Sequence, residues 1–180
     1  MAAWQPLLAQ LMRERSHLLV AYAGLYTGNV ADAEDVVQEA LIRSFSRGRS
    51  FENVAAADSY VRKAIPCVFI DRARASSSSR RAVRRSVDHA PHTVDIDAQV
   101  DVRRALHRLS PRERTCIVLR FFDDMTVPQI ATRLGISDGA VKRYLSDASS
   151  RLSEHLSIDA DWRSAPESAD VVAPTSRITF

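Results

Sequence analysis

The sequence predicts an all-α protein of two small helical domains joined by a flexible linker. Apolar residues recur at three- and four-residue steps from about residue 4 to 74 and again from about residue 99 to 156, as on helix faces that pack against a core. No stretch alternates polar and apolar residues as a half-buried strand would, and the segment between the two regions has almost no helical periodicity. A chain of 180 residues has room for two such domains.

The first domain, residues 1–75, opens with an apolar pattern over residues 4–27 that predicts one or two helices. A further helix is expected to begin at Asp32, because an aspartate side chain can accept hydrogen bonds from the unpaired amides of a first turn. Gly48 is its expected end, since glycine readily adopts the left-handed backbone that terminates helices.

Residues 49–58 are expected to form a loop, followed by a third helical stretch from about residue 59 to 74. Pro66 falls inside this stretch, and because proline lacks a backbone donor we expect a kink there or a helix that begins near it. Residues 76–98 combine a run of serines with a cluster of arginines. This composition predicts a flexible linker that lets the domains move independently.

The second domain, residues 99–156, is expected to contain one longer lead-in helix and three short helices. Each short helix has a start signal, because a hydroxyl side chain that accepts a first-turn amide stabilises a helix N-terminus. These caps are Ser110, Thr126 and Ser137. Residues 157–180 are rich in serine, aspartate, alanine and proline and are expected to form a mobile tail, with its acids covering a basic surface as the alternative.

Residues 126–152 carry the most specific structural pattern. Ala131 is small enough for two helices to cross closely, Gly135 supplies a tight turn and Val141 fills the core between the helices. These features predict a helix-turn-helix whose second helix lies in a DNA major groove. Lys142, Arg143 and Ser146 lie off the apolar seam and can face DNA. A helical hairpin that only packs is the alternative.

Two charged stretches of the first domain are candidate binding surfaces. Residues 31–45 place Asp35, Gln38 and Glu39 beside an apolar stripe, and such a face can dock on a basic helix. Residues 62–85 contain eight basic residues and one acid, next to aromatic residues. Basic side chains can follow a phosphate backbone while aromatic rings stack on unpaired bases. For both stretches the alternative is a solvated surface.

The cysteine, histidine and serine patterns contain no signature of catalysis or metal binding. Cys67 and Cys116 lie in no metal-ligand spacing, and no GxSxG, HExxH or phosphate loop frames the histidines and serines. We therefore expect no enzymatic activity, no cofactor and no metal. His89 and His92 offer a metal pair, with a solvated pair as the favoured interpretation.

The apolar residues give no sign of membrane insertion or export. No apolar stretch approaches the roughly 20 residues that span a bilayer. The first residues lack the basic start and apolar run of a signal peptide. The expected location is the cytoplasm.

The order of acidic helix, basic helix, linker and helix-turn-helix resembles the extracytoplasmic-function (ECF) class of bacterial RNA polymerase sigma factors, within the sigma-70 superfamily. The second conserved region of that family is similar to DAEDVVQEALIRSF. Its promoter-melting and minus-ten-reading helix looks like SYVRKAIPCVFIDRAR. Its fourth conserved region matches LSPRERTCIVLRFFDDMTVPQIATRLGISDGAVKRYLS.

The resemblance implies a subunit that binds core polymerase and directs promoter-specific initiation by recognising and opening minus-ten and minus-thirty-five elements. Contacts with the coiled-coil of the largest subunit are implied for Asp35, Val36, Gln38 and Glu39. Contacts with the minus-ten strand are implied for Phe51, Asn53, Tyr60, Arg62, Lys63, Arg72 and Arg74. Contacts with the minus-thirty-five element are implied for Ser137, Gly139, Lys142, Arg143 and Ser146.

The partners that the resemblance implies are promoter DNA, the polymerase coiled-coil and flap, and an anti-sigma factor that sequesters the chain. The alternative function is a helix-turn-helix transcriptional regulator that is not a polymerase subunit. Such a regulator would need no docking helix at residues 31–45, so binding to core polymerase separates the two.

Overall fold

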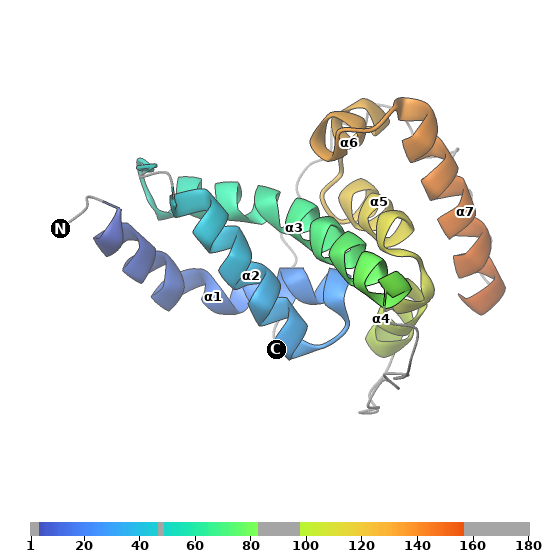
Figure 1. Ribbon diagram of the computed structural model, residues 1–180, viewed down its shortest axis with the longest axis horizontal. Helices are drawn as coiled ribbons and strands as arrows, with labels where there is room; N and C mark the ends of the chain where they lie inside the picture. Colours follow the sequence, from blue (N-terminus) through green and yellow to red (C-terminus); the bar gives the residue numbers. More distant parts are fainter. Residues whose placement is uncertain (1–3, 47–48, 83–97, 157–180) are drawn as a thin grey trace.

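The computed structural model describes residues 4–46, 49–82 and 98–156, and all regular structure in these ranges is α-helical (Figure 1). The fold class predicted from the sequence is confirmed. The N-terminal unit comprises α1 (Gln5–Thr27), α2 (Val30–Phe45) and α3 (Val54–Ala82). The C-terminal unit comprises α4 (Ala98–Arg108), α5 (Pro111–Phe121), α6 (Val127–Leu134) and α7 (Asp138–Leu156).

The core of the N-terminal unit lies where α1, α2 and α3 meet. The apolar residues that the helical spacing places on one face of each helix are buried there, among them Leu19, Val37 and Val61. Fully burying one such side chain contributes about 1.5–3 kcal/mol. The pattern over residues 4–27 forms a single helix, which settles the choice between one helix and two.

The start of α2 differs from the prediction. Asn29, not Asp32, is the N-cap: its Oδ1 accepts a hydrogen bond from the Asp32 amide at 2.8 Å. Its Nδ2 donates to Asp32 Oδ2 at 2.7 Å, so Asp32 completes a reciprocal pair from inside the first turn. α2 ends at Phe45, and the predicted terminator Gly48 lies outside the described residues.

The N-terminus of α3 also lies earlier than predicted. Asn53 Oδ1 accepts a hydrogen bond from the Ala56 amide at 2.9 Å, and the Asn53 carbonyl accepts from Ala57 at 3.1 Å. These are the contacts of a helix cap. Residues 54–58, predicted as loop, are therefore helical.

α3 continues further than predicted as well. It runs through Pro66, whose ring is fully buried, so the expectation of a helix that begins near Pro66 is wrong. It extends to Ala82, so residues 76–82 of the predicted linker are helical. Residues 83–97, with the pair His89 and His92, lie outside the described residues, as does the predicted tail.

The helix starts of the C-terminal unit are confirmed. Ser110 and Thr126 each form a capping box, and the Ser137 hydroxyl accepts from the Ala140 amide at 3.2 Å. The lead-in helix is not the longest, because α4 has 11 residues whereas α7 has 19. α7 continues because Ala148 and Leu152 extend its apolar face.

The helix-turn-helix is formed by α6 and α7. Gly135 has φ +62° and donates its amide to the Ala131 carbonyl, which closes the turn in the left-handed conformation that glycine favours. Val141 and Leu145 are fully buried between the helices. The predicted motif is confirmed.

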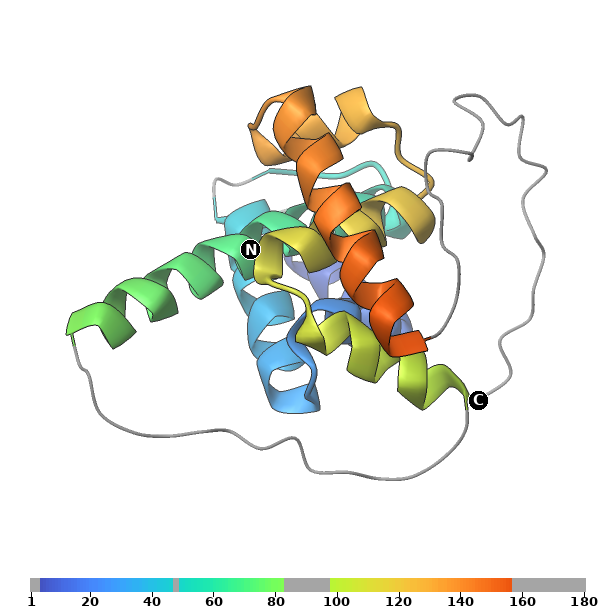
Figure 2. The same ribbon diagram turned by 90° about the vertical axis from the view of Figure 1, so that its right-hand side faces the viewer.

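The two units pack against each other (Figures 1 and 2). α5 lies beside α3 and α1, and α4 also contacts α1. Val118 of α5 is 2% exposed and belongs to the core of the N-terminal unit. The expectation of independently moving domains therefore does not describe this arrangement, in which one unit supplies a core residue to the other. Within the described ranges, no helix is both long and apolar enough to span a membrane.

Candidate nucleic-acid interface

The predicted acidic face is present on α2, where Asp35 and Gln38 are exposed and Glu39 is partly covered. Val36 is a correction to this set. Its side chain is 2% exposed and lies in the N-terminal core, because its position on the helix faces α1 and α3 rather than solvent. Val36 cannot contact a partner in this arrangement.

The carboxylates of this face are already paired with arginines. Arg72 donates to Asp35 at 3.0 Å, and Arg43 donates to Glu39 at 2.5 Å and to Asp71 at 2.7 Å. These groups remain one-third to one-half exposed, and exposed ion pairs contribute about 0–1 kcal/mol each. Pairs this weak can be exchanged for basic groups of a partner.

Arg72, for which the resemblance implies a contact with the minus-ten strand, is paired on α2 in this structure, because α3 packs on that helix. Its contact with DNA stays a prediction. Arg43 was missed by the sequence reasoning. Its position four residues after Glu39 is the spacing that predicts a pair on one helix face, and that spacing was the available signal.

Aromatic rings form a row at the start of α3. The Phe51 ring lies 5.1 Å from Phe45 and 5.3 Å from Tyr60, between ring centres. Tyr60 is 37% exposed and carries the guanidinium of Arg49 at 4.5 Å from its ring centre. A half-exposed ring beside a cation suits base stacking next to a phosphate. Asn53, two residues after Phe51, caps α3.

The basic residues of the same surface differ in exposure. Lys63 and Arg74 are exposed on α3. Arg62 instead lies under the C-terminal unit: its guanidinium is 4.3 Å from the Tyr22 ring centre and 5.9 Å from that of Phe122. It also lies 4.0 Å from Asp123 Oδ1. One predicted DNA contact is therefore flanked by residues at the end of α5, with its side chain 41% exposed.

Two buried tyrosines of α1, Tyr22 and Tyr26, lie next to the contact between Arg62 and Asp123. The Tyr22 hydroxyl donates to Asp123 Oδ2 at 2.6 Å, and it shares a hydrogen bond with the Tyr26 hydroxyl at 2.8 Å. Burial raises the pKa of Tyr22, and the Asp123 carboxylate raises that pKa further. Burial likewise raises the pKa of Tyr26. Both phenols stay protonated at neutral pH, so Tyr22 acts as a donor to Asp123.

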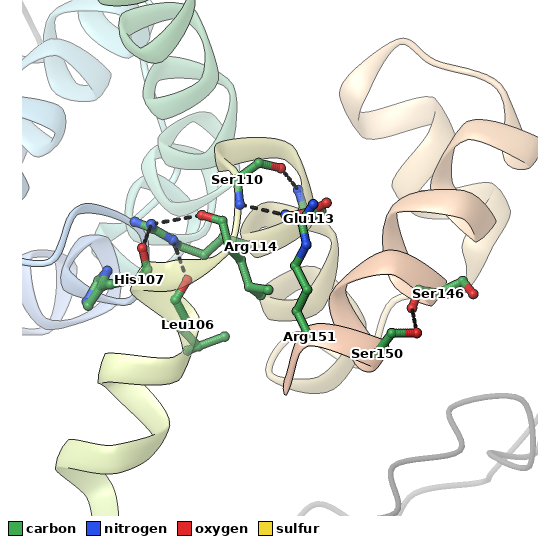
Figure 3. Close-up of polar contacts among 9 residues, drawn as sticks. Leu106, His107, Ser110, Glu113, Arg114, Ser146, Ser150 and Arg151 are labelled. Carbon is green, nitrogen blue, oxygen red and sulfur yellow. Dashed lines mark hydrogen bonds and ion pairs between the residues drawn. The ribbon is translucent and has the colours of Figure 1, made fainter. Parts of the chain in front are cut away.

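Arg114 of α5 joins the units at a second point, and Figure 3 shows its contacts with Leu106 and His107. Its side chain donates to the carbonyls of Leu106, His107 and Leu109, and across the interface to the carbonyl of Tyr26. It is 9% exposed, and burial lowers the pKa of its guanidinium to about 10, which still leaves it charged at neutral pH. The partially negative C-terminal end of α1 favours that charge.

His107 occupies the same interface. Its ring packs on Gly28, whose φ of +91° and lack of a side chain permit the contact: a Cβ there would lie 3.0 Å from His107 Nδ1. Nδ1 is buried and has no hydrogen-bond partner among the described residues. Burial lowers the pKa of His107 to about 4, with Arg114 and Arg103 adding repulsion to its charged form.

The lowered pKa of His107 predicts acid sensitivity. Because about 4 lies below the ordinary 6.5, the unfolded chain binds the proton more readily between these values, and folded-state stability falls as the pH drops through this window. We expect His107→Gln to flatten the fall in melting temperature between pH 7 and pH 5. The exposed His17→Gln serves as the control and should keep the wild-type slope. Equal slopes in all three proteins would contradict the prediction.

The predicted DNA-reading residues cluster on the first turns of α7. Gly139, Lys142 and Arg143 are exposed, whereas Ser146 is partly buried. Ser137 is exposed, and its hydroxyl is used as the cap of α7. Apart from its chain neighbours and the backbone of its own helix, no atom lies within 4 Å of where a Gly139 Cβ would be, so this turn is open to an approaching backbone.

The C-terminal half of α7 is tied to its own unit (Figure 3). Arg151 donates to Glu113 Oε2 at 2.8 Å, and the same carboxylate accepts from the Ser110 amide at 2.9 Å. The Ser150 hydroxyl donates to the Ser146 carbonyl at 3.1 Å. The basic side chains of the predicted set, Lys142 and Arg143, are exposed on the first turns of α7, and the Arg143 guanidinium lies 5.3 Å from the Tyr144 ring centre.

Together these features define a class of protein. The C-terminal unit is a helix-turn-helix with cationic side chains exposed on its second helix, and the N-terminal unit bears an acidic face and an aromatic, basic surface. This is the architecture of a two-module DNA-binding transcription protein.

Comparisons with known proteins narrow this class. The sigma-70 region 2 family model matches residues 11–79, and the sigma-70 region 4 model matches residues 99–152. The RNA polymerase sigma-E factor of Streptomyces avermitilis is 30% identical over 161 residues, covering 86% of this chain and 88% of that protein. The ECF RNA polymerase sigma factor SigL of Mycobacterium tuberculosis is 33% identical over 153 residues, covering 80% and 85%.

A solved structure shares the fold. The sigma factor RpoE from Bartonella quintana, in complex with the anti-sigma factor NepR, matches with a TM-score of 0.59 at 24% identity, over 85% of this chain and 98% of that chain. The present chain belongs to the sigma-70 superfamily, in the ECF class of RNA polymerase sigma factors. Its role is that of a sigma factor in transcription initiation.

Proposed function

We propose that the chain docks on core polymerase through the acidic face of α2, holds the separated minus-ten strand on the N-terminal unit and reads the minus-thirty-five element with α7. This proposal depends on one observation: each of the two units exposes a surface that suits a different form of promoter DNA. Exposed Lys142 and Arg143 suit the intact major groove, whereas the Tyr60 ring and Lys63 suit unpaired bases and their phosphates.

In this mechanism the polymerase adds nucleotides and the chain itself catalyses nothing. The binding energy of the two surfaces positions and opens the duplex. Unstacking a base costs a few kcal/mol, which contacts with the flipped base offset. Two tethered modules also raise each other's effective concentration at promoters that carry both elements.

Docking on the largest-subunit coiled-coil follows from the exchangeable pairs on α2. Asp35 and Glu39 are held by Arg72 and Arg43 in the free chain, and basic residues of the polymerase would replace these partners. The polymerase flap is the second proposed contact, on the C-terminal unit. An anti-sigma factor is a further proposed partner, with the cytoplasm as the location where these encounters take place.

The proposal predicts that docking depends on Gln38 and Glu39. The double variant Gln38→Ala, Glu39→Gln is expected to weaken binding to core polymerase about tenfold, which corresponds to about 1.4 kcal/mol. Affinity is measured by titrating labelled chain with core enzyme. Glu14→Gln, an exposed acid of α1, is the matched control and should bind as the wild type does.

The decisive experiment is run-off transcription with core enzyme plus the chain on fragments of the source genome. Initiation at a defined set of promoters is expected only when the chain is present. A wild-type chain that binds promoter DNA but not core polymerase would favour the plain helix-turn-helix regulator.

A further inference from the structure

We propose that a latch between the two units holds the free protein closed. In this latch the Asp123 carboxylate of the C-terminal unit lies beside the Arg62 guanidinium of the N-terminal unit. The chain thereby masks part of its own minus-ten surface. The latch comprises Tyr22, Arg62, Phe122 and Asp123. The inference rests on the proposed function in one respect, the contact of Arg62 with the minus-ten strand of promoter DNA. The masking itself is a statement about the free chain.

The Asp123 carboxylate lies beside Arg62, where a DNA phosphate would otherwise bind. Its amide and that of Phe122 donate to the Val118 carbonyl at 3.2 and 2.9 Å, which fixes the residue at the end of α5. From there Oδ2 accepts the Tyr22 hydroxyl at 2.6 Å and Oδ1 lies 4.0 Å from Arg62. An anionic oxygen beside a guanidinium is what a nucleic-acid backbone would provide. Asp123 and a phosphate therefore compete for Arg62.

Phe122 covers the same arginine from another side. Its ring lies 5.9 Å from Tyr22, between ring centres, and its centre is 5.9 Å from the Arg62 guanidinium. The Arg62 guanidinium thus has two aromatic rings and one carboxylate as neighbours, and its side chain remains 41% exposed. A promoter strand can reach this guanidinium in full only after the end of α5 has moved away.

The rest of the interface explains how the closed arrangement is held while the latch can open. Val118 is buried in the N-terminal core and Arg114 reaches the Tyr26 carbonyl, so the interface has an apolar and a polar anchor. The latch lies at its edge, where Phe122 is 51% exposed. Partly solvated pairs are weak, so a competing anion can displace them.

The test measures the accessibility of Arg62 in the free, full-length chain. Phenylglyoxal modifies arginine side chains, and mass spectrometry gives the rate at each site. Arg13, exposed on α1, is the internal reference. In the wild type we expect Arg62 to react more slowly than Arg13. Equal rates at the two sites would overturn the proposal.

Two variants then test whether Asp123 is the residue that protects Arg62 from modification. Asp123→Asn is expected to raise the Arg62 rate about fivefold or more, the change that loss of roughly 1 kcal/mol produces. Asp124→Asn is the matched control, since Asp124 is exposed, and asparagine tolerates its φ of +51°. Equal acceleration by both variants would show that Asp123 is not the latch.

Phe122→Ala provides an opening variant that changes no charge, so a faster Arg62 reaction cannot come from the loss of a neighbouring carboxylate. We expect it to raise the Arg62 rate, with helix content unchanged by circular dichroism. Its ring is half exposed, so the variant should fold. An unchanged Arg62 rate would overturn the proposal.

The failure of this proposal is distinguishable from failure of the proposed function. If Arg62 is protected in the free chain but Arg62→Ala initiates transcription normally, the closed state stands and the DNA role of Arg62 is wrong. If Arg62 is unprotected while Arg62→Ala impairs initiation, the DNA role stands and the latch is wrong.

Discussion

Replacing Arg114 by alanine is expected to lower the free energy of unfolding by about 2–4 kcal/mol, because it removes a buried charge that serves four carbonyls. Those carbonyls lie at the junction of α4 and α5 and at the end of α1, and the carbonyl of Leu106 also accepts from the Leu109 amide. The measurement is urea denaturation at neutral pH, followed by circular dichroism.

Arg112→Ala is the matched control for this variant. Arg112 is a partly exposed arginine on the same helix, and its guanidinium lies 5.8 Å from the Tyr144 ring centre. A partly solvated contact of this kind contributes about 0.5–1 kcal/mol. If Arg114→Ala were no more destabilising than Arg112→Ala, the assignment of Arg114 as the main polar anchor of the interface would be wrong.

The double variant Lys142→Ala, Arg143→Ala should abolish the advantage that a promoter gains from its minus-thirty-five element. Each lost base contact weakens recognition by about 1–3 kcal/mol, so we expect initiation at such promoters to fall at least tenfold. Both side chains are exposed on α7 and absent from its apolar core, so the fold should be unaffected. Run-off transcription on promoters with and without the upstream element measures the effect.

Arg103→Ala controls for the loss of positive charge, because Arg103 is exposed on a different helix of the same unit. It should retain the preference for the upstream element. A double variant that still distinguishes promoters with and without this element would show that another surface reads it.

Helix starts show where sequence reasoning succeeds and where it fails. Ser110, Thr126 and Ser137 were predicted as caps and are caps, because a cap depends on residues within one turn. Asp32 was predicted for the same reason and is wrong, because Asn29 stands three residues earlier and both residues join one reciprocal pair. The capping preference therefore predicted the right turn, but it assigned the cap to Asp32 instead of Asn29.

The candidate surfaces also include residues whose exposure the sequence predicts and residues whose placement depends on helix packing. Exposure of Lys142 and Arg143 follows from their positions off the apolar seam, which periodicity reveals, and their contact with DNA stays a prediction. The contact of Val36 with the polymerase was assigned by resemblance, although its place among the apolar residues of α2 already indicates burial, and packing of α3 on α2 buries it. The same packing directs Arg72 toward Asp35, which is not visible in one helix considered by itself.

The amino-acid sequence by itself determined the all-helical class, the caps of α5, α6 and α7 and the helix-turn-helix, because these depend on spacings of a few residues that one helix can satisfy alone. Only the tertiary structure decided the contact between the units. Tyr22 and Asp123 are 101 positions apart, and Arg114 and Tyr26 are 88 apart. Such pairs meet only when two cores have packed together, and periodicity within a helix carries no information about which surface another unit will cover.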